Sequence, residues 1–174
     1  MERITQIVAA VKDYCYLDRA PVQRVDLHQG LERTLVILKR KFKPGVRTLR
    51  EYAPNLPQIG GYGSELDQVW TKLISKAVEA MKGRGQLTLR MSASNGSATV
   101  AIGDTGEGLP PESQPRIFEP FFTTKPPGEG TGLGLPIAYN IVVHRHRGKI
   151  VFTSRPGETW FRVTLPIQLE QGEK

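Results

Sequence analysis

Cysteine is almost absent from this chain of 174 residues, in which Cys15 is the only one. A lone cysteine excludes an internal disulfide and suits a reducing compartment. No apolar run approaches the roughly 18 residues that a membrane-spanning helix needs, and Met1-Glu2-Arg3 does not begin a signal peptide. We therefore expect a cytoplasmic chain, with the length of one domain at roughly 100–200 residues per domain.

Histidine is scarce as well, since only His28, His144 and His146 occur, and these offer too few convergent ligands for a metal site. The net charge is +7, but the basic residues are scattered except in segments 38–43 and 144–149. Neither segment is interleaved with aromatic residues, as a platform for single-stranded nucleic acid would be. Solvated helix ends explain both segments, and no nucleic-acid partner is expected.

Apolar periodicity predicts an alternation of helices and strands. Helical patterns cover residues 3–17, 26–42, 64–81 and 132–146, and strand patterns cover residues 46–52, 86–94, 98–102, 149–154 and 159–166. Asp26 is placed to cap the second helix, Ser64 with Asp67 resembles a capping box for the third, and Asn95-Gly96 favours a tight hairpin. The sum predicts an α/β two-layer sandwich, a mostly antiparallel mixed sheet backed by helices, with an N-terminal helical segment.

Three motifs follow one another between residues 104 and 135. Asp104-Thr105-Gly106-Glu107-Gly108-Leu109 places a carboxylate on a glycine turn, where it can accept hydrogen bonds from the exocyclic amine of a base. Phe118-Glu119-Pro120-Phe121-Phe122-Thr123-Thr124-Lys125 lies in the proline-rich stretch 110–129, whose length is typical of a lid. Gly130-Thr131-Gly132-Leu133-Gly134-Leu135 begins a helix whose unpaired backbone N–H groups suit phosphate. The order predicts a nucleotide pocket that is neither a P-loop nor a Rossmann site.

These motifs closely resemble the G1, F and G2 boxes of the ATP-binding catalytic domain of sensor histidine kinases, in the superfamily with the Bergerat fold that includes gyrase B, Hsp90 and MutL. The resemblance implies such a domain over residues 21–174, and the end of a dimerisation and phosphoacceptor helix over residues 1–20. It also implies ATP with Mg²⁺, and phosphoryl transfer to a histidine outside this chain, on a helical hairpin of the same kinase. A response regulator is the implied partner, and homodimerisation is left open.

The motifs and the resemblance together predict the residues that bind ATP. They are Lys72, Lys76, Glu79, Asp104, Gly106, Gly108, Leu109, Phe122, Thr124, Lys125, Gly130, Thr131, Gly132, Leu133, Gly134, Leu135 and Thr159. Asp104 is expected to contact adenine and Lys125 to reach phosphate, whereas Thr159 either fills its strand or supports the contact with the base. Arg147 stands where the family usually has glycine, so an altered turn is expected there.

The helix predicted over residues 64–81 departs from the family pattern. The family's N box reads Asn-Leu-x-x-Asn-Ala, and its second Asn helps to hold Mg²⁺, but this chain reads Lys72-Leu73-Ile74-Ser75-Lys76-Ala77. A protonated lysine donates hydrogen bonds and cannot ligate Mg²⁺. Two interpretations stay open, a solvated lysine face or ammonium groups near the phosphates. A nucleotide sensor without catalysis, or a degenerate regulatory module, is therefore the alternative to a kinase domain.

Overall fold

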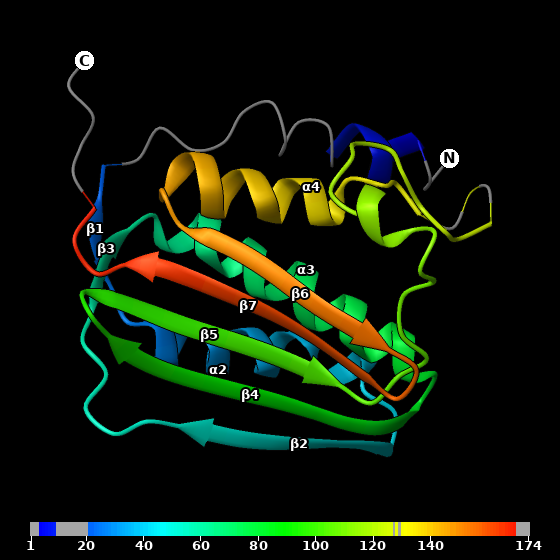
Figure 1. The fold of residues 1–174 in the computed structure, drawn as a ribbon, viewed down its shortest axis with the longest axis horizontal. Coiled ribbons are helices and arrows are strands. Elements are labelled where there is room, and N and C mark those ends of the chain that lie inside the picture. The colour runs from blue at the N-terminus through cyan, green and yellow to red at the C-terminus, as the bar shows by residue number, and fades with distance from the viewer. Residues whose placement is uncertain (1–3, 10–20, 127, 129, 170–174) are drawn as a thin grey trace.

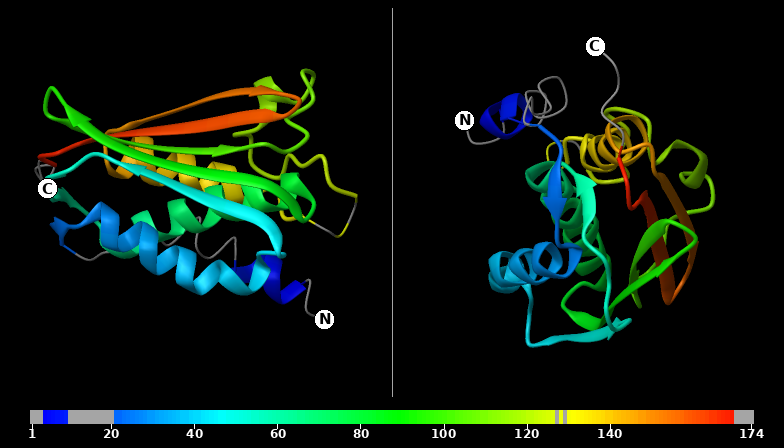
Figure 2. Two further views of the ribbon diagram at one scale, coloured as in Figure 1. Left: turned by 90° about the horizontal axis from the view of Figure 1, so that it is seen from below. Right: turned by 90° about the vertical axis from the view of Figure 1, so that its left-hand side faces the viewer.

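The computed structural model describes residues 4–9, 21–126, 128 and 130–169 of the chain. Its main sheet has the order β2 (Gly45–Tyr52), β4 (Arg84–Ser94), β5 (Ser97–Asp104), β7 (Glu158–Pro166) and β6 (Lys149–Arg155). Strands β2 and β4 are parallel, and the other neighbouring strands are antiparallel. Helices α2 (Leu27–Leu38), α3 (Gly63–Met81) and α4 (Gly134–Tyr139) lie on one face of the sheet (Figures 1 and 2). The predicted two-layer sandwich with a mostly antiparallel sheet is confirmed.

Helix α3 carries the centre of the core. Its apolar stripe, which the periodicity predicts, is at most 5 % exposed and consists of Leu66, Val69, Trp70, Leu73, Ala77 and Met81. Helix α2 packs beside it through four leucines, and Asp26 caps α2 by accepting a hydrogen bond from the backbone N–H of Gln29 at 3.1 Å. Because one face of α3 is fixed against the core, its polar face points to the region around the predicted nucleotide motifs.

Several boundaries differ from the prediction. Helix α2 ends at Leu38 and is followed by the 3-10 turn η1 (Lys39–Lys41). The capping box predicted for α3 is wrong: the helix begins one residue earlier, Tyr62 is its N-cap without a side-chain cap, and Asp67 forms an ion pair with Arg33 at 2.7 Å. The short antiparallel pair β1 (Gln23–Val25) and β3 (Ile59–Gly61) was not predicted, because three residues carry too little periodicity.

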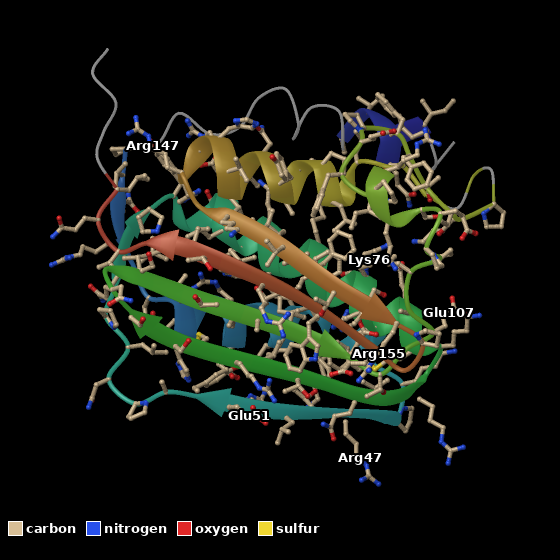
Figure 3. The ribbon with its side chains drawn as sticks, viewed as in Figure 1. Arg47, Glu51, Lys76, Glu107, Arg147 and Arg155 are labelled. Atoms are coloured by element: carbon tan, nitrogen blue, oxygen red, sulfur yellow. The ribbon has the colours of Figure 1, made fainter. Side chains whose placement is uncertain are left out.

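The segment predicted as one helix over 132–146 is two kinds of helix in succession. After α4, the residues Asn140–Arg145 form a π-helical stretch, η3, in which the N–H of His146 donates to the carbonyl of Ile141 at 3.0 Å. Arg147 follows with a φ of 52°, in the left-handed region that favours glycine (Figure 3). The turn therefore has the backbone conformation that glycine adopts most readily, but arginine occupies the position. Residues 4–9 of the predicted N-terminal helix are helical, and the rest of that predicted helix lies outside the described residues.

His146 is buried at 1 % exposure, so the expectation of a solvated helix end is wrong for this residue. Its Nε2 accepts a hydrogen bond from the backbone N–H of Tyr62 at 3.0 Å, and its Nδ1 lies 2.8 Å from the carbonyl oxygen of Ile141. This geometry requires the neutral ring with its proton on Nδ1, because a charged ring has no acceptor for Tyr62. Burial lowers the pKa of His146, and the nearby Arg145 lowers it further.

We predict that the contribution of His146 to stability is lost as the pH falls below about 6.5, the pKa of histidine in an unfolded chain. Below this pH the unfolded state binds a proton at His146 that the folded state does not bind. The contribution of His146 to the free energy of unfolding therefore decreases as the pH decreases. Urea unfolding at several pH values between roughly 7.5 and 5 measures this loss. The His146→Gln variant should show a smaller dependence over this range, and an equal dependence in both proteins would contradict the assignment.

No helix within residues 4–9, 21–126, 128 and 130–169 is long and apolar enough to cross a membrane.

Candidate nucleotide-binding site

A cleft of about 300 Å³ opens between α3, the loop from Leu109 to Leu133, and the start of α4. Figure 1 shows this loop leaving the end of β5 and passing beside α3 before it enters α4. The described residues that line the cleft are Lys41, Thr71, Lys72, Ser75, Lys76, Glu79, Leu109, Ile117, Phe122, Thr123, Thr124, Lys125, Gly130, Thr131, Gly132, Gly134, Leu135 and Pro136. Residues from η1, from α3 and from the stretch that begins at Leu109 and enters α4, which are separate in the sequence, therefore meet at one site.

Asp104 lies at the end of β5, close enough to Lys76 of the cleft for its charge to act on that lysine, and it is 6 % exposed. Its Oδ1 accepts a hydrogen bond from the backbone N–H of Gly106 at 2.9 Å, which fixes the carboxylate on the turn that follows. Burial raises the pKa of Asp104 to about 6, although the N–H of Gly106 and the charge of Lys76 act in the opposite direction. The group is thus a buried anion at neutral pH, oriented and ready to accept from a donor such as an exocyclic amine.

Glycines 106 and 108 allow the turn after Asp104 to pack closely. A Cβ on Gly106 would lie 2.6 Å from the carbonyl of Ala80 in α3, and one on Gly108, whose φ is 81°, would lie 2.7 Å from the carbonyl oxygen of Arg155. Glu107 adds an ion pair with Lys82 at 2.9 Å (Figure 3). The turn is held between the end of α3 and the β6–β7 corner, which keeps Asp104 in place.

Thr159 stands opposite Asp104 in the register of β5 and β7 and is 4 % exposed. Its Oγ1 lies 2.8 Å from Oγ of Ser154, which in turn accepts from the backbone N–H of Leu109 at 2.7 Å. Thr159 therefore belongs to a hydrogen-bonded chain that ties the first motif to the strands. These contacts go beyond filling a position in the strand. That Thr159 supports the contact between Asp104 and the base stays a prediction.

The glycine-rich turn before α4 is pinned to the loop opposite. The backbone N–H of Phe121 donates to the carbonyl of Gly132 at 2.8 Å, and the N–H of Leu133 donates to Oγ1 of Thr131 at 3.2 Å. Gly132 has a φ of 68°, and a Cβ there would lie 2.3 Å from the backbone of Phe121. Only glycine fits this position, because both the space and the backbone conformation exclude a side chain.

Three lysines reach the cleft from two sides. A Cβ on Gly134 would lie 3.8 Å from Cδ of Lys72, so the Lys72 side chain crosses the start of α4. Lys76 is half-buried, and Figure 3 shows it on α3 at the side of the loop. Burial lowers the pKa of Lys76, and the nearby charge of Lys125 lowers it further. Lys125, expected to reach phosphate, forms an ion pair with Glu79 of α3 at 2.6 Å and so links the loop to the helix.

The structure brings most of the predicted site residues together. Those that line the cleft are Lys72, Lys76, Glu79, Leu109, Phe122, Thr124, Lys125, Gly130, Thr131, Gly132, Gly134 and Leu135, whereas Asp104, Gly106, Gly108, Leu133 and Thr159 lie behind its lining. Sequence reasoning missed Lys41, Thr71, Ser75, Ile117, Thr123 and Pro136. Ser75 could have been predicted, because it lies three residues after Lys72 on the same helix. No sequence signal placed Lys41 at the site, because its segment has the pattern of a solvated helix end.

Comparison with known proteins agrees with this geometry. Residues 61–169 match the family described as histidine kinase-, DNA gyrase B-, and HSP90-like ATPase. The sensory histidine kinase/phosphatase NtrB of Escherichia coli O157:H7 is 34 % identical over 153 residues, which are 82 % of this chain and 43 % of NtrB. The catalytic domain of histidine kinase ThkA has a TM-score of 0.78 and 25 % identity, covering 86 % of this chain and 97 % of that domain.

A further structure contains ThkA in complex with the response regulator protein TrrA; it has a TM-score of 0.79 at 23 % identity and covers 95 % of this chain and 48 % of that one. This likeness shows the fold. Because the family match covers more than half of the sequence, the chain belongs to the histidine kinase-, DNA gyrase B- and HSP90-like ATPases. Within that family it is similar to NtrB-type sensory histidine kinases, and it spans less than half the length of these curated relatives.

Proposed function

We propose that this chain is the ATP-binding catalytic domain of a two-component sensor histidine kinase, and that it delivers the γ-phosphoryl group of ATP to a histidine outside this chain, on a helical hairpin of the same kinase. The observation that carries the proposal is the buried carboxylate of Asp104, fixed by Gly106 close to Lys76 of a cleft whose lining includes a glycine-rich helix start. A base acceptor beside a cleft that also holds a phosphate turn suits an adenine nucleotide.

The proposal gives each group of predicted residues a role. Asp104 accepts from the exocyclic amine of adenine, with Gly106, Gly108 and Thr159 holding it in place. The backbone N–H groups of the turn from Gly130 to Leu135 receive the phosphates, since such groups are unpaired at a helix start. Phosphoryl transfer depends on positioning and charge stabilisation more than on a covalent group of the enzyme, so no nucleophile is required in the cleft.

The partners follow from the same proposal. The phosphoacceptor hairpin belongs to the same kinase, with residues 1–20 as its last part, and a response regulator receives the phosphoryl group afterwards. ThkA, which shares the fold, has been seen with its response regulator TrrA, and this supports the second partner. We further propose that the domain works in the cytoplasm. Homodimerisation, which the sequence leaves open, would come through the hairpin.

Phosphotransfer to a separately supplied hairpin tests the proposal. The full chain is incubated with γ-labelled ATP and a hairpin that carries the acceptor histidine, with and without Mg²⁺, and label on the hairpin is followed over time. We expect the hairpin to become labelled only when both the chain and the acceptor histidine are present. A hairpin whose histidine is replaced by glutamine is the control. Nucleotide binding without any transfer would favour the alternative, a sensor of adenine nucleotides without catalysis, which the comparisons do not favour.

A further inference from the structure

The lining of the cleft is strongly positive. Its described residues include four lysines, Lys41, Lys72, Lys76 and Lys125, and a single carboxylate, Glu79. Glu79 is already paired with Lys125 at 2.6 Å. The remaining lysines have no carboxylate within the described lining to neutralise them, and a low-dielectric cleft strengthens their combined field.

The same lining offers little to a divalent cation. Mg²⁺ takes oxygen ligands in a nearly octahedral arrangement, usually from one or two carboxylates together with phosphates and water. Among the described residues of the cleft, Glu79 is the one carboxylate, and side-chain amides are missing. Gln68, one turn before Lys72 on α3, has a buried Oε1 without a partner in the described part, but it lies outside the lining. The described residues also contain no group of three or more potential metal-ligating side chains.

The lysines occupy the positions where charge neutralisation is needed. The side chain of Lys72 crosses the start of α4, beside Gly134, where the glycine-rich turn presents its N–H groups. Lys76, one helical turn further on, lines the same cleft and is close enough to Asp104 and Lys125 for their charges to act on it. Burial lowers the pKa of its ammonium group, and the charge of Lys125 does so too; a phosphate anion would relieve both effects.

We infer that the cleft binds adenine nucleoside triphosphate in its metal-free, fully anionic form, with Lys72 and Lys76 in place of the divalent cation that the family uses. The inference rests on the proposed function and deepens it by naming the ionic form of the ligand. Mg²⁺ cancels part of the charge of the triphosphate and therefore weakens its attraction to the lysines. A bound Mg²⁺ would also face two ammonium groups, which repel it.

Isothermal titration of the full chain with ATP, once with EDTA and once with excess Mg²⁺, tests the inference. We expect binding about tenfold or more tighter in EDTA than in Mg²⁺, since a unit charge pair near 4 Å is a large effect at the dielectric of a protein cleft. Affinity in EDTA should also fall as salt rises from roughly 50 to roughly 300 mM, because salt screens partly exposed charges.

The Lys72→Asn/Lys76→Asn double variant should reverse the preference, so that ATP binds more tightly with Mg²⁺, because amide oxygens can coordinate the ion or its water shell. The single Lys76→Asn variant gives an independent test if the double variant unfolds. In this variant the difference between ATP affinity in EDTA and ATP affinity in Mg²⁺ should largely disappear. Lys149→Asn, an exposed substitution on β6, is the matched control and should behave as the parent.

Three results count against the inference, and they can be told apart. Tighter binding of ATP by the parent in Mg²⁺ would show that the lysines do not replace the metal, while the proposed function would stand. Absence of ATP binding under both conditions, in the parent and in the lysine variants alike, would reject the proposed function and the inference with it. Equal salt dependence in parent and double variant would also count against a phosphate contact by these lysines.

Discussion

Replacing Asp104 with asparagine is expected to weaken ATP binding by roughly ten- to a hundredfold, because a lost or reversed hydrogen bond at a buried contact costs about 1–3 kcal/mol. The amide of asparagine presents a donor where the carboxylate presents only acceptors. The same reasoning predicts weak binding of GTP by the parent, since the guanine carbonyl is an acceptor and faces an acceptor. Calorimetric titration of parent and variant with both nucleotides, in EDTA and in Mg²⁺, measures the effect.

The Asp104→Asn variant should at the same time be no less stable than the parent at neutral pH. Burial raises the pKa of Asp104 to about 6, so the folded state binds a proton more tightly than the unfolded state, whose pKa is near 3.8. The titration of Asp104 therefore adds stability to the parent as the pH falls from about 6 to 3.8, opposite to the effect of His146, and at pH 7 its charge costs about 1–3 kcal/mol that asparagine avoids. A variant that loses affinity only because it unfolds would contradict this, and urea unfolding at pH 7 separates the two cases.

Replacing Gly132 with alanine is expected to abolish most nucleotide binding. A Cβ there would lie 2.3 Å from the backbone of Phe121, and the φ of 68° is unfavourable for any residue with a side chain. The turn must move, the hydrogen bond from Phe121 to Gly132 is lost, and the N–H groups before α4 no longer converge. We expect affinity for ATP to fall by at least about tenfold and the free energy of unfolding by about 1–3 kcal/mol.

Gly96→Ala is the matched control for that variant. Gly96 has a φ of 76°, but a Cβ there would meet nothing within 4 Å, and the residue lies in the β4–β5 hairpin away from the cleft. It should lose stability through its backbone conformation and keep the ATP affinity of the parent. Equal loss of affinity in both variants would mean that general destabilisation, and not the turn before α4, controls binding.

The sequence predicts the long elements well, because their periodicity extends over several turns or pleats. The apolar stripe of α3 and the Asn95-Gly96 hairpin are where the pattern places them, with Asn95 and Gly96 both at positive φ. The ends of helices that depend on tertiary contacts are harder to predict from the sequence. The N-terminus of α3 depends on His146, which is distant in the sequence and accepts from the backbone of Tyr62, so a local capping rule misplaces it.

The sequence predicts the parts of the candidate site that are formed by glycine-rich turns. It predicts less well the parts where side chains from different elements meet. The two glycine motifs identify the turns, because their close approaches exclude other residues. The ion pair between Lys125 and Glu79, and the position of Lys41 at the cleft, depend on how α3 packs against the loop and on where α2 ends. The π-helical stretch after α4 is likewise set by packing, since its sequence reads as an ordinary helix.

A calorimetric titration of the full chain with ATP and with GTP at neutral pH tests the nucleotide site most directly. The buried carboxylate of Asp104 beside the cleft and the glycine-rich turn in its lining predict saturable binding of one ATP per chain, with GTP much weaker. Binding of neither nucleotide, or equal binding of both, would contradict the assignment of this cleft to adenine nucleotides.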